Sequence, residues 1–190
     1  MMRKSTIALA AAAGGVLLTL LVSVISSSSS SSMASDAASY GEDRALIENL
    51  QARYLFALDF HDPDLYVSTF TPDGILDYGT GEVRGREAIR EVIAGMPGNS
   101  PAPVDDGLRP AAGRHHISNI VLKIDGDRAT GRAYWFHTGN DNPERRTTIG
   151  GFGHYEDEIV RVNGEWLFAK RTIYNEGVLE WAAPGANPAW

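Results

Sequence analysis

Four long stretches in the C-terminal half of the chain have the residue pattern of β-strands and follow one another closely. They span residues 114–124, 128–138, 148–162 and 165–174. Gly126-Asp127 and Asn163-Gly164 are tight turn signals, and each joins two adjacent members of the set as a hairpin. This feature constrains the fold most strongly, because such hairpins predict a meander of long antiparallel strands.

Helical segments precede these strands. Asp43 can cap a helix that runs to about Phe60. Pro63 is well placed to open a second helix through Phe70, and residues 85–96 predict a third. Helices followed by a meander predict an α+β fold, in which a cone-shaped, curved antiparallel or mixed sheet wraps around the N-terminal helices. Apolar residues of the first helix recur at helical spacing and predict its core-facing stripe: Ile47, Leu50, Tyr54 and Leu58.

The first 39 residues differ from the rest of the chain. Basic residues precede an uncharged stretch over residues 7–25, and a serine run over residues 26–32 follows as a flexible linker. The pattern resembles a signal peptide or, because the stretch approaches the ~20 residues that span a bilayer, a retained membrane anchor. We therefore expect an exported or membrane-anchored protein. The alternative is that translation starts at Met33, which would make the protein cytoplasmic.

Composition limits the remaining choices. Residues 40–182 fit one domain, and residues 183–190 form a C-terminal tail. The chain has no cysteine, which excludes disulfides, a thiolate zinc site and a cysteine nucleophile. Its formal net charge is −7, with no run of Lys and Arg to bind phosphates, so a nucleic-acid partner is not expected.

One carboxylate and one histidine stand out as a candidate pair. Asp59 extends a mostly apolar stripe of the first helix, where a carboxylate is costly unless a partner accepts it. Strict alternation places His116 on the more apolar face of its strand, so we expect it to face the interior and contact Asp59. A carboxylate that holds an imidazole makes it a usable general base. The residues predicted to share the face of His116 are Ser118, Ile120, Leu122 and Ile124.

The reverse face of the same strand has a different expected role. His115 is expected there as a structural residue, and Ile117 and Val121 on this face favour a homodimer or homotrimer. Adjacent strand residues point to opposite faces, so His115 and His116 cannot both bind one metal ion. Neither a metal nor another cofactor is expected.

Several local motifs carry a family resemblance. They are Tyr54 to Asp59, Phe70-Thr71-Pro72-Asp73-Gly74, Gly85-Arg86-Glu87-Ala88-Ile89, Arg114-His115-His116-Ile117-Ser118-Asn119, and Gly153-His154-Tyr155-Glu156-Asp157 leading to Asn163-Gly164-Glu165-Trp166. Together with the order of elements, they resemble the SnoaL-like branch of the nuclear-transport-factor-2-like superfamily, which contains scytalone dehydratase and bile-acid 7α-dehydratase. The resemblance covers nearly everything after Tyr40.

The resemblance implies roles for individual residues. Asp59 and His116 match the aspartate and histidine of these dehydratases, while Tyr54 and Tyr78 match tyrosines that hold a substrate oxygen. His137 falls near a second histidine of the family. Fold alone does not assign chemistry, because the superfamily also includes isomerases, cyclases and binding proteins.

These observations give a functional hypothesis. We expect a cofactor-independent lyase of the dehydratase type that acts on a small cyclic or aromatic hydroxylated substrate. An isomerase or cyclase that uses the same pair, or a non-catalytic binding module, is the alternative. Alternation separates His154 from Tyr155 and leaves open which of them lines the pocket. The predicted substrate-binding residues are His137, Tyr155, His154 and Trp135.

Overall fold

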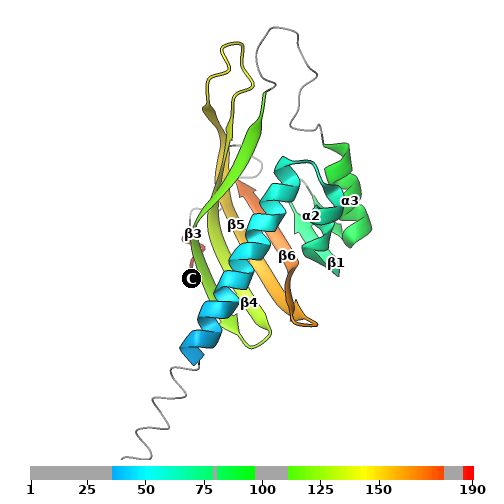
Figure 1. Ribbon diagram of the computed structural model, residues 1–190, viewed down its shortest axis with the longest axis vertical. Coiled ribbons are helices and arrows are strands. Elements are labelled where there is room, and N and C mark those ends of the chain that lie inside the picture. The colour runs from blue at the N-terminus through cyan, green and yellow to red at the C-terminus, as the bar shows by residue number, and fades with distance from the viewer. Residues whose placement is uncertain (1–35, 79–80, 97–110, 178–185) are drawn as a thin grey trace, which may run out of the picture. The chain divides into compact units, whose positions relative to one another are not determined.

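A computed structural model describes residues 36–78, 81–96, 111–177 and 186–190 (Figure 1). The chain divides into two compact units, Met1–Asp43 and Arg44–Trp190. In the first unit, residues 36–43 are described and are helical. The expected signal or anchor segment lies outside the described residues. Within the described ranges, no helix is long and apolar enough to cross a membrane.

The helices lie in the predicted regions, but the first already includes residue 36, so the prediction that Asp43 caps it was wrong, and the second ends before Phe70. The first helix covers residues 36–59, of which 44–59 belong to the second unit. Helix α2 is Pro63–Ser68, and Oδ1 of Asp62 caps it by accepting from the backbone N–H of Leu65 at 2.9 Å. Helix α3 is Arg86–Gly95.

The sheet has six strands: β1 (Phe70–Asp77), β2 (Glu82–Arg84), β3 (Gly113–Asp125), β4 (Arg128–Gly139), β5 (Thr148–Val162) and β6 (Glu165–Asn175). Their order is β2-β1-β6-β5-β4-β3. β1 pairs in parallel with β6, and the other pairs are antiparallel, so the sheet is mixed. The four long strands confirm the predicted meander. The short strand β2 was not predicted.

The predicted α+β fold is confirmed, because the first helix packs against one face of the sheet (Figure 1). Ile47, Leu50 and Tyr54, which the helical stripe predicts as core, are each 0% exposed. They share one hydrophobic cluster with sheet residues that include Phe168 and Ile159. We call the face of the sheet that meets this helix the inner face, and the opposite one the outer face.

A β-bulge in β3 changes which of its side chains point inward. The pairing of β3 with β4 shifts by one residue between Ser118 and Val121. Asn119 within this shift has φ 52°, a left-handed conformation that asparagine tolerates better than most residues. Ile117 therefore packs against the core, which contradicts its predicted place on the reverse face. Val121 stays on the outer face and is 40% exposed.

An ion pair lies in the core between β5 and β6. The guanidinium of Arg171 donates from Nε and Nη2 to the two oxygens of Asp157, at 2.8 and 2.7 Å. Both side chains are 0% exposed, and Gln51 of the first helix also donates to Asp157, at 3.3 Å. Burial alone would lower the pKa of Arg171, but the carboxylate of Asp157 raises it, so the guanidinium remains charged. Three rings surround the guanidinium at 4.1–4.2 Å, those of Tyr54, Tyr155 and Phe168.

Candidate active site

The carboxylate of Asp59, at the end of the first helix, binds His115 at the start of β3. Oδ1 of Asp59 lies 2.7 Å from Nδ1 of the His115 ring. The backbone N–H of His115 also donates toward both carboxylate oxygens, at 3.1 Å to Oδ1 and 3.0 Å to Oδ2. Asp59 is 8% exposed, so these contacts replace the hydration that burial removes. The carboxylate thus orients the imidazole, and Nε2 is the ring nitrogen left for a ligand.

His116 does not occupy its predicted place. It is exposed on the outer face, where its ring stacks on Phe136 with centroids 4.7 Å apart and its Nε2 lies 3.0 Å from Oγ1 of Thr138. The prediction that His116 faces the interior and pairs with Asp59 was wrong. The alternation of inward and outward side chains holds as predicted from Ile120 onward. The bulge at Asn119 reverses the direction of the side chains between it and the start of the strand.

His115 forms part of the wall of a cavity of about 250 Å³. Strands β3 to β6 supply one side of this cavity, while the first helix, α3 and the residue after β1 supply the other. Among the described residues that line it, none is Asp, Glu, Lys or Arg, so its polar side-chain groups are hydroxyls, imidazoles, an indole N–H and an amide. The lining residues are Tyr54, Leu58, His61, Tyr78, Ile93, Met96, His115, Trp135, Tyr155, Ile173 and Asn175.

The predicted tyrosines both line this cavity. Tyr54 is 0% exposed and borders the cavity from the core, while Tyr78 is half-buried. Burial raises the pKa of Tyr54 although Arg171 opposes the effect, so its hydroxyl remains a proton donor at neutral pH. Tyr155 and Trp135, two of the predicted substrate-binding residues, also line the cavity. The Nε1–H of Trp135 donates to the backbone oxygen of Tyr174 at 3.0 Å, which fixes the indole in the wall.

Comparisons with known proteins place the chain in a family. A family model described as a SnoaL-like domain matches residues 39–172. The chain belongs to the SnoaL-like family. The uncharacterized protein Rv2910c of Mycobacterium tuberculosis is 28% identical to it over 131 residues, which make up 68% of this chain and 82% of that protein.

Solved structures share the SnoaL-like fold. Rv3472, a protein of unknown function from Mycobacterium tuberculosis, matches with a TM-score of 0.64 at 26% identity, over 75% of this chain and 77% of that chain. A Novosphingobium aromaticivorans protein described as a "Putative Scytalone Dehydratase" matches with a TM-score of 0.58 at 24% identity, over 77% and 92% of the two chains. These matches agree with the resemblance found in the sequence motifs.

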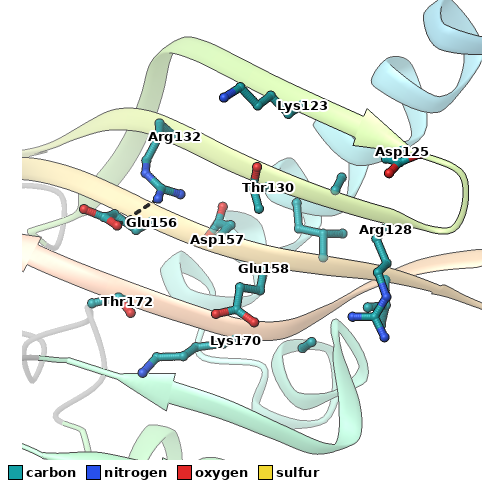
Figure 2. A pocket seen from close by; sticks show the side chains of 14 residues that line it. Lys123, Asp125, Arg128, Thr130, Arg132, Glu156, Asp157, Glu158, Lys170 and Thr172 are labelled. Carbon is teal, nitrogen blue, oxygen red and sulfur yellow. Dashed lines mark ion pairs between the residues drawn. The ribbon is translucent and has the colours of Figure 1, made fainter. Parts of the chain in front are cut away.

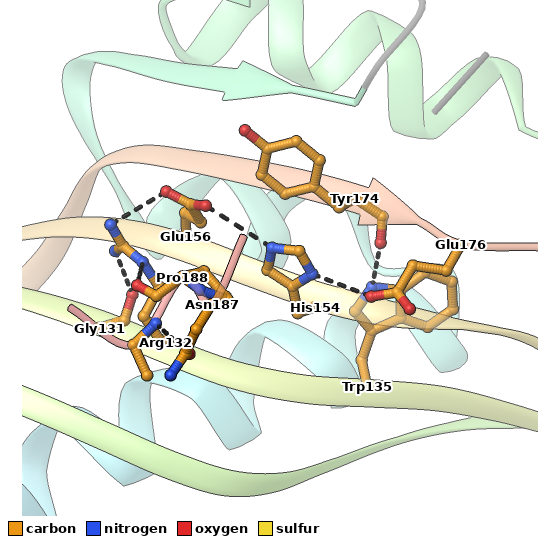
Figure 3. Close-up of polar contacts among 10 residues, drawn as sticks. Gly131, Arg132, Trp135, His154, Glu156, Tyr174, Glu176, Asn187 and Pro188 are labelled. Carbon is orange, nitrogen blue, oxygen red and sulfur yellow. Dashed lines mark hydrogen bonds and ion pairs between the residues drawn. The ribbon is translucent and has the colours of Figure 1, made fainter. Parts of the chain in front are cut away.

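His154 lies outside the inner cavity lined by His115, on the outer face of β5. Its Nδ1 is 3.1 Å from a carboxylate oxygen of Glu176 and its Nε2 is 3.6 Å from one of Glu156 (Figure 3). Its ring stacks on Tyr174 with centroids 4.6 Å apart. The structure therefore does not place His154, a predicted substrate-binding residue, at this cavity, because alternation along β5 sends Tyr155, and not His154, inward.

His137 lies beside His115 on the inner face. Their ring centroids are 4.7 Å apart, and a side chain at Gly113 would overlap the His137 ring, so this glycine makes room for it. Burial and then the neighbouring His115 lower the pKa of His137, which keeps it neutral at neutral pH. His137 is not among the lining residues of the inner cavity. It therefore packs against the His115 ring, and the structure gives it no direct place beside a ligand.

A larger hollow, of about 490 Å³, lies on the outer face of the sheet (Figure 2). Two of the cations that line it are paired with carboxylates: Arg132 lies 3.0 Å from Glu156, and Lys170 lies 3.1 Å from Glu82. The described tail residues also contact this face, since the ring of Trp190 lies 4.3 Å from Nζ of Lys123. No histidine or tyrosine is among its described lining residues, so the inner cavity is the better candidate site despite its smaller volume.

Besides His115, two polar lining residues were not singled out from the sequence. His61 follows the first helix and has φ 53°, and Asn175 ends β6. Their positions gave a signal: His61 comes two residues after Asp59, and the start of β3, which holds His115, lies at the same end of the sheet as the end of β6. Neither residue belongs to a regular alternation pattern, so the sequence alone did not single them out.

Proposed function

We propose that this protein is a cofactor-independent lyase of the dehydratase type. The observation that carries the proposal is the contact of Asp59 with both the ring and the backbone of His115, at the wall of the inner cavity. Such an arrangement supplies an oriented base with a carboxylate that stabilises its protonated form. The similar fold of the Novosphingobium protein described as a "Putative Scytalone Dehydratase" adds support for this class of reaction.

The proposed reaction begins with removal of a proton next to a substrate carbonyl by Nε2 of His115. Asp59 stabilises the imidazolium that forms, and Tyr54 and Tyr78 donate hydrogen bonds to the enolate oxygen. The enolate then re-forms the carbonyl, and its electrons make a carbon–carbon double bond as the C–O bond to the β-hydroxyl breaks. The departing hydroxide takes the proton from His115 and leaves as water, which restores the neutral base.

The cavity favours a small, neutral ligand with a ring. No charged side chain is available among its described lining residues to balance a phosphate, a carboxylate or an ammonium group. Trp135 and Tyr155 offer flat surfaces, with ring centroids 6.1 Å apart and planes 24° apart. Rings of this kind bind cyclic and aromatic ligands by stacking. The proposed substrate is thus a cyclic or aromatic β-hydroxy ketone.

A screen of such ketones tests the proposal. Purified protein is incubated with each compound, with and without a chelator, and mass spectrometry follows the loss of one water. A lyase yields the dehydrated product at the same rate in both conditions. An isomerase yields a product of unchanged mass, and a binding module yields none. A rate that a chelator abolishes contradicts the proposal.

The two tyrosines are expected to matter less than the base. Tyr78→Phe and Tyr54→Phe should each lower kcat by about 10- to 1,000-fold, because each removes one of several donors to the enolate oxygen. Steady-state kinetics on a substrate found in the screen measures the effect. Phe60→Tyr is a control outside the cavity, since Phe60 is 63% exposed, and it should keep the wild-type rate. If both single variants turn over substrate at the wild-type rate, then the two tyrosines do not take part in the mechanism.

We also propose that the protein forms a homo-oligomer through its outer face. Three large side chains at one end of this face are at least half exposed: Tyr134 at 53%, Phe152 at 50% and Ile149 at 69%. Exposed apolar side chains gathered in this way are typical of protein–protein contacts. Light scattering should therefore give the mass of a dimer or trimer at micromolar concentration. Tyr134→Glu should lower the measured mass toward that of the monomer. A wild-type monomer under these conditions would contradict this.

A further inference from the structure

We propose that Tyr66 is a positioning residue that aims the hydroxyl proton of Tyr54 into the cavity. Tyr66 stands on α2 and does not line the cavity. Its hydroxyl lies 2.6 Å from that of Tyr54. The inference rests on the proposed function in one respect, namely that Tyr54 donates to a ligand oxygen.

The count of protons in this pair gives the direction of the bond. The two hydroxyls carry two protons but share one hydrogen bond, and the two side chains are 0% and 1% exposed. Among the described residues, nothing accepts the second proton. If Tyr54 donated to Tyr66, the unused proton would sit on Tyr66, buried and out of reach of any ligand. With Tyr66 as the donor, the unused proton belongs to Tyr54, which borders the cavity.

The surroundings of the pair favour this direction. Burial raises the pKa of Tyr66 well above its ordinary value, and Tyr54 adds to the effect, so Tyr66 stays a protonated donor. A hydroxyl that accepts a hydrogen bond becomes a stronger donor itself, because the bonds polarise one another. The guanidinium of Arg171 lies 4.2 Å above the Tyr54 ring and favours the negative charge that grows on it during donation.

A binding experiment tests the role of Tyr66 without any need for turnover. The probe is 4-nitrophenolate, whose oxygen resembles an enolate oxygen, and nitrobenzene serves as the matched probe without that oxygen. Quenching of tryptophan fluorescence reports both, since Trp135 lines the cavity. Four proteins are compared: wild type, Tyr66→Phe, Tyr54→Phe and the double variant. Urea unfolding of each confirms that the fold persists.

The expected result is a coupled pair. Tyr66→Phe should weaken 4-nitrophenolate binding by about 10-fold in the wild-type background and should have no effect in the Tyr54→Phe background. Nitrobenzene should bind all four proteins alike. Equal weakening by Tyr66→Phe in both backgrounds overturns the inference, as does a wild type that binds both probes equally. If the protein dehydrates no compound in the screen but the effect of Tyr66→Phe still depends on Tyr54, then the proposed function is wrong and the role of Tyr66 stands.

Discussion

Replacement of His115 by alanine is expected to lower kcat by about 10²- to 10⁴-fold, the range for loss of a positioned general base. Asp59→Asn should fall in the same range, because a neutral amide cannot stabilise the imidazolium and does not fix the reactive tautomer. KM should change less than kcat, since both changes leave the aromatic and apolar lining residues of the cavity in place. Steady-state kinetics, with folding checked by circular dichroism, measures both effects.

His116→Ala is the matched control for this prediction. His116 is the next residue along β3, but it lies on the outer face against Phe136 and Thr138. Its loss should therefore leave kcat near the wild-type value. If His116→Ala loses turnover while His115→Ala keeps it, then the base has been assigned to the wrong histidine.

Asp157→Ala is expected to lower the free energy of unfolding by about 3–5 kcal/mol, because it leaves the Arg171 guanidinium charged, buried and without its carboxylate. The double variant Asp157→Leu with Arg171→Met should be less harmful than this single change, since it removes both charges together. Urea unfolding followed by circular dichroism gives the three free energies.

An exposed ion pair provides the comparison. Arg53 and Glu165 lie 3.2 Å apart with side chains 43% and 57% exposed, so Glu165→Ala should cost only about 0–1 kcal/mol. A cost for Asp157→Ala no larger than that for Glu165→Ala would mean that the buried pair does not stabilise the fold as inferred.

The fold could be predicted from the sequence because it depends on local signals that are also present in the structure. Hairpin turns, a proline at the start of α2 and the apolar stripe with Ile47 and Leu50 each act over a few residues, so the sequence displays them directly. The short strand β2 escaped prediction because three residues are too few to show alternation.

The site was harder to predict because it depends on how strands are aligned. Asp59 was expected to hold a strand histidine, and it does. One extra residue at Asn119, however, puts His115 in the place that was predicted for His116. A similar shift between Glu158 and Ile159 aligns Asp157 with Arg171, whereas counting back from the Asn163-Gly164 turn aligns it with Lys170. Asparagine in mid-strand is a signal for the first shift, while no residue type marks the second.

A ligand-bound crystal structure tests the central claim most directly. Crystals are soaked with a substrate from the dehydration screen, or with 4-nitrophenol. The account predicts that the ligand occupies the inner cavity, with one oxygen within hydrogen-bond distance of Tyr54 or Tyr78 and its reacting carbon next to Nε2 of His115. A ligand bound in the outer-face hollow of Figure 2, with the inner cavity left unoccupied, would contradict it.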